Sequence, residues 1–100
     1  MNAGAKGTRN ERRCEAELKK LGHLTWRVRR GKFGGNDVFD RFDILSLDNT
    51  LGVMYLIQVK SNRVRKRDRE KVFGLNLPMS CHPQIWIWVD RKGWRRIEKK

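Results

Sequence analysis

Two apolar stretches on either side of a short polar turn constrain the fold of this chain more than any other feature. Residues 38–47 and 53–60 are rich in aliphatic and aromatic side chains, and residues 48–52 between them carry the Asp, Asn and Gly of a tight turn. This pattern predicts a β-hairpin. Toward its end the first stretch is apolar at successive positions, as strands are when both faces of a sheet are covered.

A helix is predicted near the N-terminus. Thr8 and Glu11 have the spacing of a capping box with Thr8 as the N-cap, which places the helix start at that residue. Residues 1–7 are mostly small or polar, and we expect them to form a flexible arm. The apolar residues from Cys14 to Leu21 recur at helical spacing and predict the buried face of this helix.

The rest of the chain supplies three more strands and a second helix. Residues 24–30 alternate in polarity and predict a strand, followed by a glycine-rich loop over 31–37. The charged segment 61–73 predicts a helix, and 84–90 and 94–98 predict two strands. The order helix, three strands, helix, two strands predicts a single α/β domain that spans the whole chain, with a central mixed sheet flanked by helices.

The charge of the chain is far from balanced. It has 24 Lys and Arg residues against 11 Asp and Glu, a net charge of +13 over 100 residues. Solubility does not require this excess, whereas a polyanionic partner does, and nucleic acid is the commonest. Because the basic residues are spread along the chain and no predicted helix is both basic and strongly apolar, we expect DNA as the partner and no membrane or small-molecule substrate.

Cysteine usage and hydropathy indicate the compartment. Cys14 and Cys81 lie far apart and fit no metal-binding spacing, so we expect no zinc site and interpret both as buried thiols of a cytosolic protein. No apolar run reaches the roughly 18 residues that cross a membrane, and no signal h-region is present. The expected location is the cytoplasm.

Polar side chains stand in the two hairpin strands away from the turn. Residues two apart in a strand share a face, so Gln58 and Lys60 point the same way, and Asp43 can meet them across adjacent strands. A buried carboxylate needs a metal, an opposite charge or several hydrogen bonds. One interpretation is a structural ion pair between Asp43 and Lys60.

The other interpretation is a metal site beside a phosphate. Asp43 and Gln58 offer side-chain oxygens, and Val59 offers its backbone carbonyl, to a hard cation such as Mg²⁺ or Mn²⁺. Lys60 would hold the attacking water or stabilise charge that builds on the phosphate. Glu11 could cap its helix, or reach the metal directly or through water, and Glu15 is the neighbouring candidate one turn along.

Four segments in this order resemble the PD-(D/E)xK nucleases. Their order and spacing are most similar to the archaeal-type Holliday junction resolvases, including versions carried by phages. The resemblance implies a restriction-endonuclease-like fold, magnesium-dependent phosphodiester cleavage and a homodimer acting on four-way junctions. It assigns the catalytic positions to Glu11, Asp43, Gln58 and Lys60. The segments are residues 7–12, 28–31, 42–45 and 56–61, within a matched region of roughly 6–62.

Gln58 departs from that family, which usually has Glu or Asp at this position. An amide keeps an oxygen ligand but removes one negative charge, so metal affinity is expected to fall. Activity could persist with Mn²⁺ or with one metal, or be lost. Asp37 and Asp40 lie near the same strand as Asp43, and either could supply the missing charge.

Basic residues near the predicted site are the candidates for DNA contacts. They occur at the N-terminal helix, around the glycine-rich loop and in the segment 61–71, which holds six basic residues against two acidic ones. A solvated helix face is the alternative for that segment. The candidates are Arg9, Arg29, Arg30, Lys32, Arg63, Arg65, Lys66 and Arg67.

The aromatic and histidine residues receive structural interpretations. Trp86 and Trp88 share one face of a predicted strand, which favours a core or dimer interface over base stacking. His23 and His82 have no ligand partner in spacing, and neither is assigned a catalytic role.

The sequence thus predicts a metal-dependent, structure-selective DNA endonuclease, most closely a Holliday junction resolvase that acts as a homodimer on branched DNA with Mg²⁺ or Mn²⁺. One alternative is a non-catalytic nucleic-acid-binding protein with a nuclease fold, which Gln58 favours. Another is a different nuclease of the superfamily, for repair or restriction. The resemblance extends the expected location to an archaeal, bacterial or phage-infected cell.

Overall fold

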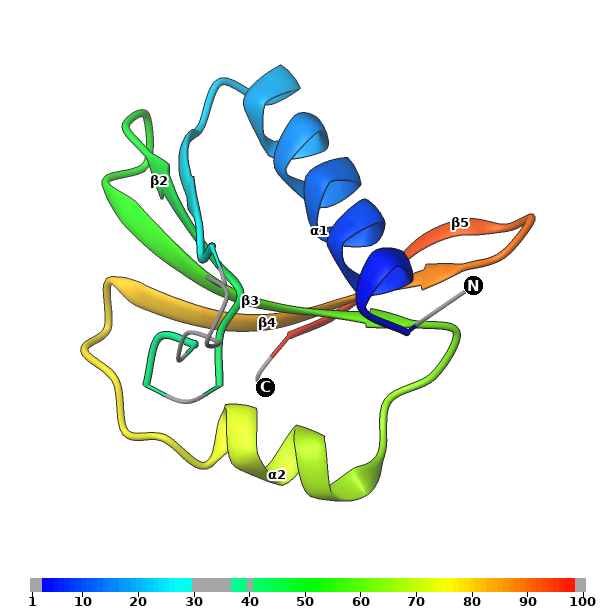
Figure 1. Cartoon of the computed structure of the whole chain (residues 1–100). Helices are drawn as coiled ribbons and strands as arrows, with labels where there is room; N and C mark the ends of the chain where they lie inside the picture. The colour runs from blue at the N-terminus through cyan, green and yellow to red at the C-terminus, as the bar shows by residue number, and fades with distance from the viewer. Residues whose placement is uncertain (1–2, 30–36, 40, 99–100) are drawn as a thin grey trace.

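The predicted hairpin is present, and the other elements are arranged around it (Figure 1). The computed structural model describes residues 3–29, 37–39 and 41–98. The order of helices and strands is the one predicted from the sequence. The elements are α1 (Ala3–Lys20), β1 (Leu24–Arg27), β2 (Ile44–Asp48), β3 (Val53–Ser61), α2 (Lys66–Phe73), β4 (Cys81–Val89) and β5 (Gly93–Glu98).

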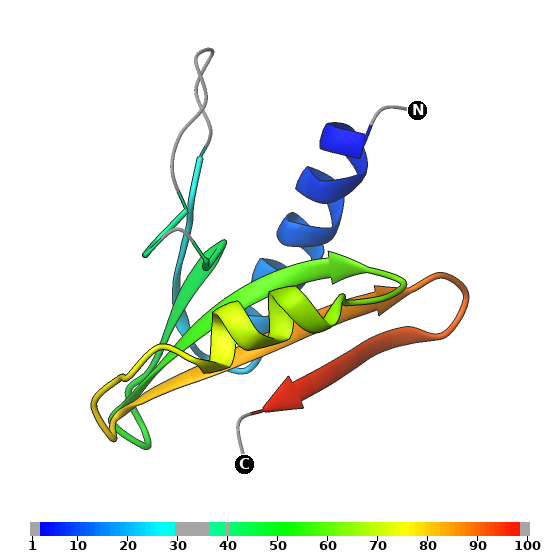
Figure 2. The same cartoon turned by 90° about the horizontal axis from the view of Figure 1, so that it is seen from below.

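The strands form one mixed sheet in the order β1-β2-β3-β4-β5. Neighbouring strands are antiparallel except β3 and β4, which run parallel and are joined by a crossover through α2. The helix α1 covers one face of the sheet, and α2 lies across the other (Figures 1 and 2). The prediction of a single α/β domain with a restriction-endonuclease-like mixed sheet is confirmed.

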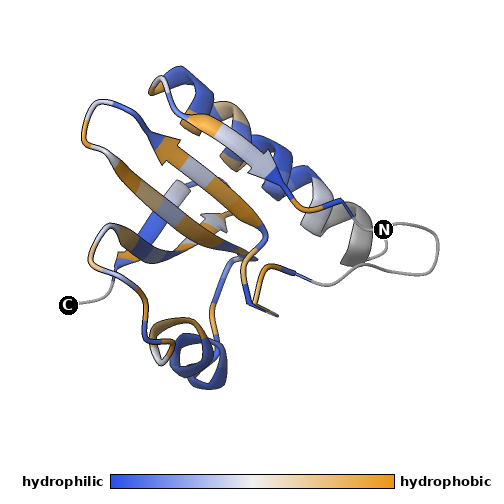
Figure 3. Ribbon diagram, turned by 90° about the vertical axis from the view of Figure 1, so that its left-hand side faces the viewer, coloured by the Kyte–Doolittle hydropathy of each residue, from blue (hydrophilic) through white to orange (hydrophobic). Residues whose placement is uncertain are grey.

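Each face of the sheet carries an apolar layer. This explains why many residues of the central strands are hydrophobic (Figure 3). Adjacent residues on β3, such as Leu56 and Ile57, enter opposite layers. Trp86 is buried in the layer under α1, so the core interpretation of this residue is confirmed. The α1 layer contains Cys14, Leu18, Ile44, Ile57 and Trp86. The α2 layer contains Phe42, Leu56, Val72, Ile85 and Ile87.

The turn between β2 and β3 fixes their register. Gly52 adopts a φ of +68°, and its N–H donates to the Asp48 carbonyl at 2.8 Å. Pairing runs from Asp48 opposite Val53 at the turn to Ile44 opposite Ile57 at the far end. The next residues beyond the last pair are the polar ones that the sequence singles out.

The N-terminal helix begins earlier than the sequence predicts. It starts at Ala3, so the capping-box interpretation of Thr8 and Glu11 is wrong, and so is the flexible arm for residues 3–7. Alanine and lysine favour helix, and the interior Gly7 costs only about 1 kcal/mol, which burial of the helix can offset. Glu11 therefore lies well inside α1, and the capping role is removed.

The buried face of α1 also differs from the prediction at its C-terminal end. Leu21 is 57% exposed, because the helix ends at Lys20 and the chain turns away at Gly22 with a φ of +86°. The buried stripe instead extends back to Asn10, one turn before Cys14. A polar residue thus occupies a core position of this helix.

The two hairpin strands, β2 and β3, differ from the predicted strands at the ends away from the turn. The strand β2 begins at Ile44, and before it the Val38 and Phe42 backbones pair with each other in an isolated bridge, with two hydrogen bonds of 3.0 Å. The strand β3 continues to Ser61 at its C-terminal end, where Asn62 turns the chain with a φ of +63°.

The helix α2 consequently begins at Lys66 rather than near residue 61. No helix in the described part of the chain combines the length and the apolar character needed to cross a membrane.

Candidate active site

Asp43 is fixed where β2 and β3 stop pairing. Its N–H donates to the Ile57 carbonyl and its carbonyl accepts from the Val28 N–H, both at 2.8 Å. Its Oδ2 atom accepts a hydrogen bond from the Val59 N–H, also at 2.8 Å. The residue is only 5% exposed. The carboxylate just before β2 is therefore hydrogen-bonded to the backbone of β3 at Val59, between Gln58 and Lys60.

Gln58 precedes Val59 on β3 and carries a buried oxygen. The residue is 9% exposed, and its Oε1 atom is fully buried without a hydrogen-bond donor from the described residues. A buried carbonyl oxygen left without a donor costs about 1–3 kcal/mol, so it is normally satisfied by a partner. An oxygen-seeking cation would satisfy it.

Glu11 approaches from the helix. It is 5% exposed and stands one turn before Cys14, which is fully buried. Burial raises the pKa of the Cys14 thiol, and the charge of Asp43 and, after it, that of Glu11 raise it further, while Arg96 opposes them. The charges of both carboxylates therefore act on the Cys14 thiol.

Lys60 shares its strand face with Gln58 but has a partner that the sequence does not suggest. Its Nζ atom lies 3.4 Å from Oδ2 of Asp68 on α2. The predicted structural pair with Asp43 is replaced by this contact with the helix on the same face. Among the predicted residues, the fold joins Asp43 directly to Val59, places Gln58 beside that contact, and turns Lys60 toward α2.

A polar bridge ties α1 to the end of β3, and the sequence interpretation misses it. Asn10 Nδ2 donates to Ser61 Oγ at 2.6 Å, and Arg13 Nη1 donates to Asn10 Oδ1 at 3.1 Å. The Arg13 guanidinium also lies 4.0 Å from the ring centroid of Trp88. The sequence signal is the position of Asn10, four residues before the buried Cys14. This bridge fixes the helix that carries Glu11 against the strand that carries Lys60.

The donor set fits a hard divalent cation. Within residues 3–29, 37–39 and 41–98, no three Asp, Glu, His or Cys side chains gather as a metal cluster. The candidate donors are the Asp43 carboxylate, the Gln58 amide oxygen on the α2 side of the sheet, the Glu11 carboxylate on α1, and backbone carbonyls, which are the oxygen types that Mg²⁺ and Mn²⁺ take. The unsatisfied Gln58 oxygen is the observation that supports the fit. Asp37 is half-buried and has an interaction of its own, and Asp40 lies outside the described residues.

The predicted DNA-binding residues lie on the surface wherever they are described. Arg30 and Lys32 lie outside the described residues. A cleft of about 350 Å³ adds a basic concavity between α1 and β1, lined by Thr8, Arg12, Arg27 and Arg29. Arg12 and Arg27 are absent from the predicted contacts, although Arg27 belongs to the basic run before the glycine-rich loop. The exposed predicted residues are Arg9, Arg29, Arg63, Arg65, Lys66 and Arg67.

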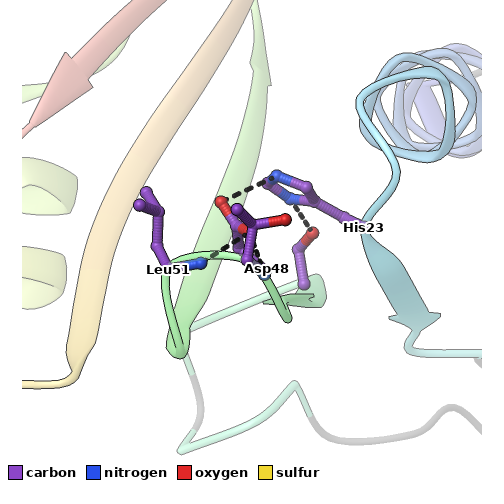
Figure 4. A network of polar contacts seen from close by, with 5 residues as sticks. His23, Asp48 and Leu51 are labelled. Carbon is purple, nitrogen blue, oxygen red and sulfur yellow. Dashed lines mark hydrogen bonds and ion pairs between the residues drawn. The ribbon is translucent and has the colours of Figure 1, made fainter.

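A second polar cluster lies at the opposite end of the hairpin (Figure 4). His23 Nδ1 is 2.8 Å from Ser46 Oγ, and its Nε2 is 3.5 Å from Asp48 Oδ2. The ring stacks on Tyr55 at a centroid distance of 5.6 Å. Ser46 is fully buried, so a substrate cannot reach it as a nucleophile. The cluster ties the end of α1 to the hairpin.

Comparison with known proteins bears on the fold. No family model matches the sequence, and no curated protein matches it. Among solved structures, the chain is similar to Hjc, a Holliday junction resolvase from the archaeal hyperthermophile Archaeoglobus fulgidus. The TM-score is 0.60 at 23% sequence identity, and the match covers 93% of this chain and 72% of that one.

Proposed function

We propose that this chain is a metal-dependent, structure-selective DNA endonuclease that hydrolyses phosphodiester bonds at four-way junctions. The observation that carries the proposal is the buried Gln58 oxygen without a donor among the described residues, next in the chain to Val59, whose N–H donates to the Asp43 carboxylate. The similarity of the fold to a Holliday junction resolvase supports the choice of substrate.

Each site residue then has a separate task. Asp43, Gln58 and Glu11 supply oxygen atoms that would hold Mg²⁺ or Mn²⁺, with the Val59 carbonyl as a further donor. The bound cation supplies Lewis acidity at the phosphate and at the attacking water. Lys60 donates hydrogen bonds to that water or to the phosphate oxygen on which negative charge accumulates.

The basic surface supports DNA as the substrate. The chain as a whole has a net charge of +13, and the arginine-lined cleft between α1 and β1 has the size and charge to hold backbone phosphates. A protein that neutralises about six to ten phosphates loses roughly 10³–10⁵ in affinity between 50 and 200 mM salt. Binding to a junction should therefore weaken steeply with salt.

A homodimer is part of this proposal. Leu24 and Trp26 share one face of the edge strand β1 and are 62% and 61% exposed. Thr25 between them bonds Glu15 of α1, so the two apolar side chains point away from that helix. Exposed apolar side chains of this size on a sheet edge are suited to burial between two subunits. Sedimentation of Trp26→Ser should show a shift toward monomer.

A second candidate is a DNA-binding protein that has lost catalysis. The neutral amide of Gln58 and the lack of a third clustered acid in the described residues favour it. Such a protein would bind junctions with the same salt dependence and would leave them uncut with either cation.

The test is cleavage of a synthetic four-way junction, compared with linear duplex and flap DNA, over a titration of Mg²⁺ and Mn²⁺. Lys60→Ala should lose nicking and keep junction binding. Lys20→Ala is the matched control, because it removes the same charge from an exposed side chain at the C-terminal end of α1, to which no DNA contact is assigned, and it should cleave normally. Equal cleavage by both variants would refute the site.

The substrate panel also separates the candidates. Preference for duplex or flap over the junction would identify a repair or restriction nuclease. Tight, salt-sensitive junction binding without cleavage in either cation would select the DNA-binding protein.

A further inference from the structure

We propose that Asp68 is a positioning residue of the candidate active site and that it holds the Lys60 ammonium in place. The inference rests on the proposed nuclease function. The Lys60 Nζ and Asp68 Oδ2 atoms are 3.4 Å apart, and the side chains are 31% and 25% exposed. An ion pair that is mostly covered is less screened by water and salt than one on an open surface.

The connection between β3 and α2 is built to bring these residues together. Directly after β3, the Asn62 N–H donates to the Trp88 carbonyl at 2.8 Å. The Asn62 side chain also donates to Asp90 Oδ2 at 3.1 Å and accepts from the Asp90 N–H at 2.9 Å. The chain leaving Lys60 is thus fastened to the end of β4 before α2 begins. This fastening gives α2 a defined path back along the sheet (Figure 2).

The face that α2 presents to the sheet includes Asp68. Val72, four residues later on the same helical face, is fully buried in the α2 layer. By contrast, Glu70 lies 3.9 Å from Lys66 in a pair whose side chains are 67% and 90% exposed. The two acids of a strongly basic segment therefore face opposite ways, and the sheet-facing one contacts Lys60.

Lysine chemistry explains what this contact does. The ammonium is a compact charge on a flexible four-carbon stem, and ordering such a side chain costs about 2 kcal/mol of rotamer entropy. It has three donors, so one can bond Asp68 while the others stay available to a water or a phosphate oxygen. Asp68 thus orients Lys60 before substrate arrives, and it brings negative charge to a site where Gln58 is neutral.

Asp68→Asn tests the role, with Glu70→Gln as the matched control, because each variant removes one negative charge from the same helix. Asp68→Asn should lower kcat for junction cleavage by about 10-fold or more while KM changes less than about twofold, as loss of a supporting partner does. Glu70→Gln should leave both unchanged. Asp68→Glu, which keeps the charge, should recover most of the wild-type kcat.

A second measurement is independent of cleavage. Nitrogen-15 relaxation of the Lys60 ammonium, in protein without metal or DNA, should show an ordered group in the wild type and in Glu70→Gln, and a mobile one in Asp68→Asn. Circular dichroism will show whether each variant keeps its helices. If Asp68→Asn disturbs α2, the mobility of the Lys60 ammonium is compared between the wild type and Asp68→Glu, which should keep it ordered.

These readouts separate the two proposals. A wild-type protein that cuts no DNA removes the nuclease proposal, and the mobility of the Lys60 ammonium then decides the positioning role by itself. Wild-type kcat, raised kcat or an equally ordered ammonium in folded Asp68→Asn would each overturn the positioning role.

Discussion

An acidic residue lies at each end of the paired strands β2 and β3: Asp48 is half-buried and Asp43 is buried. We call the end with Asp48 the turn end and the end with Asp43 the open end. At the turn, Asp48 accepts from the N–H groups of Thr50 and Leu51 and pairs with His23 (Figure 4). At the open end, Asp43 accepts from the N–H of Val59, the residue after Gln58, whose side-chain oxygen no described residue satisfies. The acid at the turn thus has its partners within the fold, whereas the Gln58 oxygen, like the buried Nε atoms of Arg27 and Arg41, has no partner among the described residues.

The largest expected effect is the loss of cleavage when the acid of the open end is changed. Asp43→Asn should lower junction nicking by about 10³-fold or more, because Lewis-acid stabilisation at a metal is worth several kcal/mol. Asp48→Asn should nick normally. Single-turnover cleavage of both variants at saturating Mn²⁺ measures the difference.

The Asp43→Asn and Asp48→Asn variants control for each other's effect on stability. Asparagine can accept the same N–H groups at either position, so both variants are expected to fold. If Asp48→Asn loses nicking as severely as Asp43→Asn, the distinction between a structural and a catalytic acid is wrong.

A second contrast uses two buried glutamines. Gln84 is 5% exposed and is satisfied within the fold, because its amide donates to Glu98 at 3.1 Å and its oxygen accepts from Trp86 at 2.9 Å. Gln58→Glu should destabilise the metal-free protein by about 3 kcal/mol, since it buries another charge, and Mn²⁺ should restore stability by binding the folded state.

Gln84→Glu should be destabilised to a similar degree and should not be rescued by the cation. Thermal melting with Mn²⁺ and with a chelator measures both variants. Rescue of both, or of neither, would show that Gln58 does not mark a metal site.

The sequence contains enough information for the central part of this fold. Strand alternation and the Asp48–Gly52 turn predict the hairpin, and the hairpin sets Asp43 beside the residues of β3. The segments on either side are predicted less well. Their limits depend on contacts between distant residues, such as Asn62 with Asp90, which local propensity does not contain.

Partner choice in the candidate site shows the same limit. Spacing predicts that Gln58 and Lys60 share a strand face, because alternation is a local property. The pairing of Lys60 with Asp68, and the bridge from Asn10 to Ser61, depend on how two helices dock on opposite faces of the sheet. A single sequence shows which residue types occupy those positions. It does not show which helix residue will face which strand residue.

The third prediction concerns the turn end. His23→Ala removes the contacts to Ser46 and Asp48 and the stacking on Tyr55, and it should lower the free energy of unfolding by about 2 kcal/mol. Nicking at saturating Mn²⁺ should remain normal below the melting transition. Urea unfolding measures the stability, and an activity loss in folded protein would mean that this end communicates with the site.

The smallest expected effect is a pH dependence that belongs to the open end. Burial, together with the charges of Asp43 and Glu11, raises the pKa of the Cys14 thiol above its ordinary value of 9.0. Below pH 9 the thiol is protonated in both states, so its contribution to stability is fully present. Above pH 9 the unfolded chain releases the proton and the folded chain keeps it, so the free energy of unfolding falls by up to about 1.4 kcal/mol per pH unit.

Cys14→Ala should lack this component, although its stability is lower at every pH because the change leaves a cavity. The difference in unfolding free energy between wild type and Cys14→Ala should therefore shrink by about 1.4 kcal/mol from pH 8 to pH 10. Cys81→Ala controls for a half-buried thiol near the turn end. A constant difference for Cys14→Ala would mean that the thiol ionises as readily in the folded chain as in the unfolded one.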